Sequence, residues 1–158
     1  MQNIFPGERG FTLIEVVIVL ALVAFVANDA LLISFDAYRA NSYRNERSTF
    51  IALLQHARAQ SMHSVCLAAV CSQAPAHGVA IRSGRYVLFE GASYASRTVD
   101  LDSIIDESPL TVHAGISEVI FQPSSGHFFT PGDIILSAPD GHVSIITIGA
   151  EGQISWTN

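Results

Sequence analysis

The chain has 158 residues, of which 49% are hydrophobic and only 14% carry a charge. Ordinary globular proteins have about 25% charged residues, so this composition excludes a chain that is intrinsically disordered along its whole length. There are 14 acidic residues and 8 basic ones, all of them arginine, which gives a net charge of −6. A nucleic-acid partner is therefore not expected, because binding to phosphates needs clustered cations.

The N-terminal part of the chain holds most of the apolar excess. Residues 11–35 read FTLIEVVIVLALVAFVANDALLISF, with no polar side chain from Val16 to Ala27. About 20 apolar residues suffice for a helix to cross a bilayer, so this segment is long enough. A plain signal anchor does not explain Glu15, because a charge near the bilayer centre costs ~2.5–3.5 kcal/mol. A cleaved secretory signal does not fit either, since no convincing small-residue cleavage site follows the run.

Helical character continues beyond the apolar run. Neither glycine nor proline occurs between Phe11 and Val65, and apolar residues recur three or four apart in residues 36–65. We therefore expect one continuous helix that is apolar on all sides over 11–35 and amphipathic over 36–65. A helix of this kind fits a segment that leaves a membrane and then packs on a domain.

Residues 66–158 form the predicted β-rich head. Short alternating segments lie between turn sequences, and they read HGVAIRS, RYVLFE, SEVIFQ, DIILSA, VSIITI and QISW. The first two flank Ser83-Gly84, which predicts a two-residue hairpin. Residues 91–115 show the least pattern, so we expect a long loop there with one short strand near Leu110–Val112. The predicted fold class is α+β, with a long N-terminal helix packed on a small antiparallel sheet or sandwich.

The residues around Gly10 carry a recognisable motif. The segment ERGFTLIEVVIVLALVAFVA combines a short polar leader that ends in Gly10, then Phe11, then Glu15, and then the apolar run. It resembles the N-terminus of type IV pilins and type II secretion pseudopilins. The resemblance implies a type IV pilin-like fold, cleavage of the leader 1–10 between Gly10 and Phe11 by prepilin peptidase, N-methylation of Phe11, and a role for Glu15 in filament assembly.

A second segment narrows this resemblance. NERSTFIALLQHARAQSMHSVCLAAVC is similar to the GspH/FimT family of minor pilins, the H-type pseudopilins, in which a helix ends in an Ala-Arg pair, here Ala57-Arg58. The helix-loosening proline of many pilin helices is absent, and Leu31-Leu32 occupy that region. The resemblance implies a single-pass protein of the bacterial inner membrane with a periplasmic or extracytoplasmic head. Its implied partners are other pilin or pseudopilin subunits, prepilin peptidase and the inner membrane.

Glu15 also has a role that follows from its chemistry. Beside the protonated amine of Phe11 on an adjacent subunit, its carboxylate gains a charge-assisted hydrogen bond and relieves the amine's desolvation cost. Such pairing requires a fixed stagger between subunits, so Glu15 would set their register. The alternative is a Glu15 that snorkels to the headgroup boundary and has no role in assembly.

Cys66 and Cys71 lie outside the cytoplasm in the implied topology. A short disulfide between them is expected in an oxidising compartment, with buried free thiols as the alternative. It would fix the junction between the helix and the sheet.

An acidic cluster follows in the least patterned segment. Asp100, Asp102, Asp106 and Glu107 fit a solvated loop, and the three aspartates are also a weak calcium candidate, because calcium prefers several oxygen ligands at alternate positions. We expect no other metal site, no cofactor and no enzymatic activity, since the sequence contains no catalytic motif.

Two functions are compatible with these observations. The first is a structural minor subunit that primes or caps a type IV pilus or a type II secretion pseudopilus. The alternative is a binding module at a pilus tip, for example a DNA receptor in natural transformation, or a binder of surfaces or secreted substrates. Some members of the resembled family bind DNA through basic residues near the end of the chain, yet residues 131–158 contain no arginine or lysine.

Overall fold

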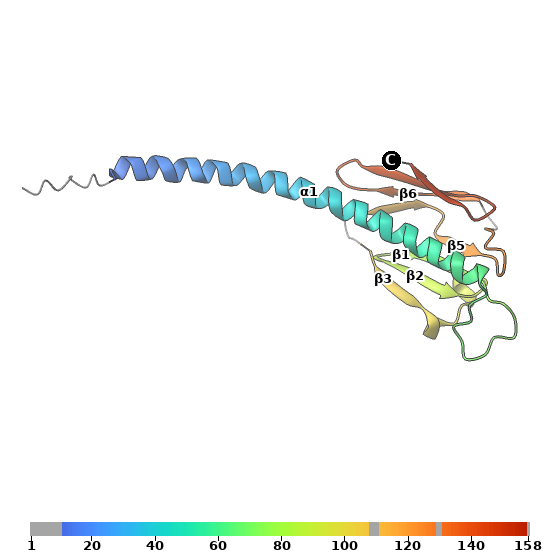
Figure 1. The fold of residues 1–158 in the computed structure, drawn as a ribbon. Helices are drawn as coiled ribbons and strands as arrows, with labels where there is room; N and C mark the ends of the chain where they lie inside the picture. Colours follow the sequence, from blue (N-terminus) through green and yellow to red (C-terminus); the bar gives the residue numbers. More distant parts are fainter. Residues whose placement is uncertain (1–10, 108–110, 129–130, 158) are drawn as a thin grey trace, which may run out of the picture. The chain divides into compact units, whose positions relative to one another are not determined.

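The computed structural model describes residues 11–107, 111–128 and 131–157, and at 28–34 and 36 only their backbone. Its fold class is α+β, as the sequence predicts (Figure 1). One long helix, α1 (Leu13–Met62), precedes a series of short strands and two 3-10 helices. The chain divides into two compact units, residues 1–38 and residues 39–158, of which the second contains the C-terminal part of α1 and all the strands.

The helix α1 ends at Met62 without a glycine or a proline. Ser64 takes a left-handed conformation, with φ of 49°. The amide of Val65 donates to the carbonyl of Gln60 at 2.9 Å, and the amide of Ser64 donates to that of Ser61 at 3.1 Å. This pair of bonds is a Schellman motif, in which a left-handed residue closes the last turn. The predicted helix to Val65 is therefore slightly too long, because serine occupies the position that glycine usually marks.

The strands form two four-stranded antiparallel sheets. Sheet A has the order β3-β2-β1-β5 and contains β1 (His77–Arg82), β2 (Arg85–Glu90), β3 (Ser103–Asp106) and β5 (Glu118–Phe121). Sheet B has the order β4-β6-β7-β8 and contains β4 (Val112–Gly115), β6 (Gly132–Ser137), β7 (Val143–Ile148) and β8 (Ile154–Thr157). The six strands that alternate clearly in the sequence are all confirmed.

The segment 91–115 differs from the predicted long loop. It contains two 3-10 helices, η1 (Tyr94–Ser96) and η2 (Val99–Leu101), as well as strand β3, which pairs with β2. Alternation does not predict strand β3, because its two apolar residues, Ile104 and Ile105, are adjacent and flanked by polar ones. The strand expected near Leu110–Val112 is β4, and Leu110 itself lies outside the described residues.

The core of the head lies between both sheets and the C-terminal part of α1. One side of that part of the helix contributes buried residues, which are Tyr43, Phe50, Ile51, Leu53, Leu54 and Ala57. Inward-facing strand residues complete the cluster, among them Val79, Tyr86, Leu88, Val119, Phe121, Ile134, Leu136, Ile146 and Ile148. In Figure 1 this green part of α1 lies against strands of both sheets. The predicted amphipathic face is thus confirmed.

The other face of sheet A is also covered. Ala80, Val87 and Phe89 form a second, smaller apolar cluster there, and Tyr94 and Ile120 pack against it. Because Tyr94 belongs to η1, the two 3-10 helices form a layer over the outer face of sheet A. Arg97 directly follows η1 and therefore belongs to this layer.

Ser61 connects the end of α1 to sheet A. It is fully buried, and its hydroxyl donates to the carbonyl of Phe121 at 3.0 Å while it accepts from the amide of His77 at 2.8 Å. Both bonds are made by one side-chain oxygen, so the last turn of the helix is fixed to strands β1 and β5.

We expect Ser61→Ala to lower the free energy of unfolding by about 1–3 kcal/mol, because it leaves the buried amide of His77 without its partner. Chemical denaturation of the full chain in detergent measures the loss. The control Ser83→Ala, in the exposed hairpin turn, is expected to change stability by less than about 0.5 kcal/mol. Equal effects of the two substitutions would contradict this role for Ser61.

Candidate functional site

The N-terminal end of α1 is capped by Thr12. The amide of Glu15 donates to the Thr12 carbonyl at 3.1 Å and to its hydroxyl oxygen at 3.3 Å. Threonine is a favoured N-cap residue, and a glutamate three positions later completes the spacing of a capping box. The spacing Thr-x-x-Glu is the sequence signal for this cap, and the resemblance to pilins implies no role for Thr12. Glu15 therefore also lies where the helix dipole favours a negative charge.

Apolar side chains at the start of α1 point outward on every side. All described residues from 11 to 27 are exposed, and Phe11 and Leu13 reach 82% and 83% exposure. Glu15 lies on the same side as Phe11, and with Val16, Val19 and Leu20 these residues line a small hollow of about 270 Å³. The structure therefore places Phe11, the predicted cleavage and methylation residue, beside Glu15, the predicted assembly residue, on an apolar surface. Gly10 lies outside the described residues.

Within the described part of the chain, no helix meets the length and hydropathy needed to cross a membrane.

Residues 6–27 match a family model. They form a prokaryotic N-terminal methylation motif. No curated protein and no solved structure gives a significant match to the chain. The methylation motif supports a type IV pilin-like protein that is processed by prepilin peptidase and assembles with other pilin subunits.

The methylation motif includes the three residues on which the predicted processing and assembly depend, Gly10, Phe11 and Glu15. The motif ends at residue 27, well before Ala57-Arg58, so it does not test the resemblance to the GspH/FimT family. That narrower assignment remains a prediction.

In the head, Cys66 and Cys71 are joined by a disulfide, with their Cα atoms 6.0 Å apart. The bond closes a short loop directly after the end of α1. The amide of Leu67 in this loop donates to the Glu90 carboxylate at 2.7 Å, which connects the loop to strand β2. Val70, near the tip, is 86% exposed.

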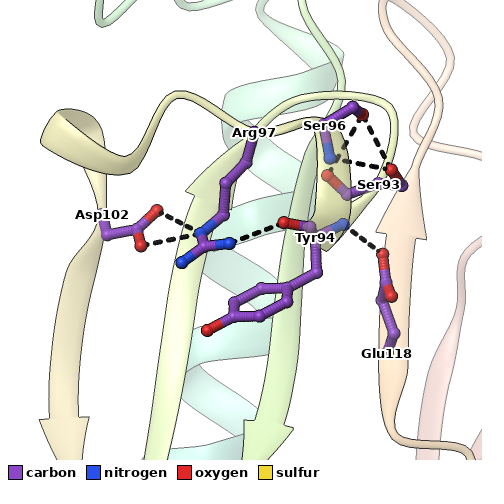
Figure 2. A network of polar contacts seen from close by, with 6 residues as sticks. All are labelled: Ser93, Tyr94, Ser96, Arg97, Asp102 and Glu118. Atoms are coloured by element: carbon purple, nitrogen blue, oxygen red, sulfur yellow. Dashed lines mark hydrogen bonds and ion pairs between the residues drawn. The ribbon is translucent and has the colours of Figure 1, made fainter.

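The acidic cluster does not form a calcium site. Asp102 is nearly buried and accepts two bonds from Nε of Arg97, at 2.8 and 3.1 Å (Figure 2). Asp100 lies in η2, and Asp106 lies in β3 opposite Arg85. Across the described residues, no three histidine, cysteine or acidic side chains are placed to hold a metal ion.

A buried polar network crosses the head near strand β4. His113 Nδ1 lies 2.6 Å from Glu107 Oε1, and its Nε2 lies 2.6 Å from the hydroxyl of Tyr86. The network joins sheet A to sheet B through Tyr86 on β2 and His113 on β4, which are 27 positions apart in the sequence. Its only sequence signal is a histidine and a glutamate six positions apart in a segment without pattern.

Burial shifts the titration of this network. Desolvation raises the pKa of Glu107 and lowers the pKa of His113, while burial and the nearby Glu46 raise the pKa of Tyr86. Both members of the His113–Glu107 pair thus favour their neutral forms. Because the folded chain resists protonation of His113, the unfolded chain takes up more protons at that residue as the pH falls below about 6.5. Glu107 acts in the opposite direction, since its raised pKa favours the folded state as the pH falls.

We expect the stability advantage of the wild type over His113→Gln to shrink as the pH falls from 7.5 to 5.5. The reason is that the substitution removes the imidazole of His113, whose protonation favours unfolding. Denaturant unfolding at each pH gives the difference. The exposed Ser83→Ala removes no titratable group and is the control, and its difference from the wild type is expected to stay constant. An advantage that grows on acidification would contradict the assigned direction for His113.

Proposed function

We propose that this chain is a minor pilin or pseudopilin subunit of the GspH/FimT type. The observation that carries the proposal is a methylation motif at the start of a helix whose described side chains from 11 to 27 are all exposed. An apolar surface of this kind is stable only where lipid or other apolar helices cover it. In the proposal the inner membrane covers it first, and helices of neighbouring subunits cover it in the filament.

Each residue of the motif then has a distinct role. Prepilin peptidase removes the leader 1–10 by cleaving between Gly10 and Phe11, and the new amine on Phe11 is methylated. The methylated amine remains cationic, so it pairs with Glu15 of a neighbouring subunit. The apolar surroundings of Glu15 strengthen this pair because the local dielectric is low. The pair fixes the stagger between adjacent helices.

The head lies outside the cytoplasm in this proposal. The disulfide between Cys66 and Cys71 supports that placement, because disulfides persist in oxidising compartments. The role proposed for the head is structural, namely to prime or cap a pilus or pseudopilus, and not enzymatic. A DNA-receptor role is less well supported, since the segment 131–158 offers no cation for phosphates.

The first test changes the cleavage site. A bulky charged residue in Gly10→Glu should leave uncleaved precursor in the membrane, because only a small residue fits beside the scissile bond in the proposed processing. The control Gly10→Ala should mature, at a normal or reduced rate. Immunoblots of cells that express prepilin peptidase distinguish the two forms by size. Complete maturation of the Gly10→Glu chain would contradict the assignment.

The second test removes the carboxylate of Glu15. Glu15→Val should insert into the membrane at least as well as the wild type, because a charge leaves the apolar run, yet its incorporation into filaments should drop at least tenfold. The control Glu8→Val makes the same exchange in the leader, so its mature protein is unchanged. Recovery in sheared filaments is the readout. Wild-type recovery of Glu15→Val would show that the carboxylate does not set the register.

A further inference from the structure

Three arginines surround a hollow on the outer face of sheet A. Arg82 and Arg85 flank the hairpin turn between β1 and β2, while Arg97 follows η1 in the layer above. The hollow has a volume of about 450 Å³ and is also lined by Tyr94. Segments that are well separated in the sequence therefore bring three of the eight basic residues to one place.

Two of these guanidinium groups are held in place by the ring of Tyr94. Cζ of Arg82 lies 4.1 Å from the ring centroid, and Cζ of Arg97 lies 3.6 Å from it. Both distances are within the range of cation–π contact. Stacking of this kind orients the arginines before any ligand arrives, which lowers the entropy lost on binding.

Hydrogen bonds also hold Arg97 and Tyr94 in place. Arg97 donates from Nε to both oxygens of Asp102 and from Nη1 to the carbonyl of Tyr94 at 2.6 Å (Figure 2). The amide of Tyr94 in turn donates to the carboxylate of Glu118 on β5, at 2.6 Å (Figure 2). The side chain of Asp102 is only 5% exposed and that of Arg97 is 16% exposed, so this ion pair is largely shielded from solvent.

Donor groups remain for a ligand. Nη1 of Arg82 donates to the carbonyl of Ile81, and among the described residues no hydrogen bond occupies Nη2 of Arg82 or Nη2 of Arg97. Arg85 is exposed at the rim. The hollow thus contains three guanidinium groups against the one carboxylate of Asp102, with Asp106 opposite Arg85 at the edge. This local excess of positive charge, in a chain of net charge −6, suits an oxyanion.

Apolar side chains beside the arginines limit which kind of negatively charged ligand fits the hollow. Val99 and Ile104 line the hollow and are 62% and 54% exposed, while Val87 is buried at its floor. A ligand that fills the hollow must therefore place aliphatic groups next to its negative charge. A sugar–phosphate backbone places oxygen-rich sugars and no branched aliphatic side chains beside its charge, whereas an aspartate or glutamate between aliphatic residues has both a charge and such side chains.

We propose that this hollow binds a carboxylate flanked by aliphatic side chains on a segment of another polypeptide. Arg82 and Arg97 contact the carboxylate through their free Nη2 groups, and Val99 and Ile104 contact the neighbouring aliphatic groups. This goes beyond the proposed function, which gives the head no ligand, and its test requires neither processing nor assembly.

The test uses the full chain in detergent micelles and two soluble probes, N-acetyl-Val-Glu-Val-amide and the same tripeptide with Gln. NMR follows the side-chain Nε–H signals of arginine and the methyl signals of valine and isoleucine. The Glu probe should shift the signals of Arg82, Arg97, Val99 and Ile104 and saturate. The Gln probe should bind at least about tenfold more weakly, because it lacks the charge that strengthens these bonds.

Variants assign the binding to the hollow. Arg82→Gln should weaken the Glu probe about tenfold, which corresponds to about 1.4 kcal/mol. Arg85→Gln, at the exposed rim, should weaken it about threefold and serves as the second variant should Arg82→Gln disturb the fold. The control Arg44→Gln makes the same charge change at an exposed position on α1 and should leave the affinity unchanged.

Several results would overturn the proposal. These are equal affinity of the Glu and Gln probes, no binding at millimolar concentration, or an affinity that neither Arg82→Gln nor Arg85→Gln reduces. Tighter binding of inorganic phosphate or of a short DNA duplex than of the Glu probe would also overturn it, because it would show that the aliphatic neighbours of the carboxylate contribute nothing.

Discussion

The exposed apolar surface at the start of α1 is the constraint on which the rest of the account depends. Each described side chain from 11 to 27 is exposed, and most of them are large and aliphatic. Removing apolar surface from water gains about 25 cal/mol per Å², so this segment is strongly driven towards lipid or other apolar helices. In the proposed assembly, the one carboxylate in it, Glu15, pairs with the N-terminal amine of a neighbouring subunit.

The head depends on the C-terminal part of the same helix. That part fills the space between sheets A and B, and polar contacts fix it at its end through Ser61. The buried network around His113 connects the two sheets independently. The head therefore has polar contacts at both junctions, between α1 and sheet A and between the two sheets. The features that stand out on it are the disulfide-closed loop and the arginine hollow.

Local signals in the sequence predict a large part of this structure. The absence of glycine and proline from Phe11 to Val65 indicates the long helix, and alternation over six segments indicates most strands. The end of α1 could not be predicted, because Ser64 adopts a conformation that the sequence normally marks with glycine. The arginine hollow could not be predicted either, since the contact of Tyr94 with Arg82 depends on how a 3-10 helix lies over a sheet.

The central claim is that the methylation motif at residues 6–27 directs cleavage after Gly10 and methylation of Phe11. Tandem mass spectrometry of the N-terminal peptide, on protein extracted from the membranes of a cell with an active prepilin peptidase, tests it most directly. The account predicts a mature chain that begins with N-methylated Phe11. A chain that begins at Met1, or at any residue after Phe11, would contradict it.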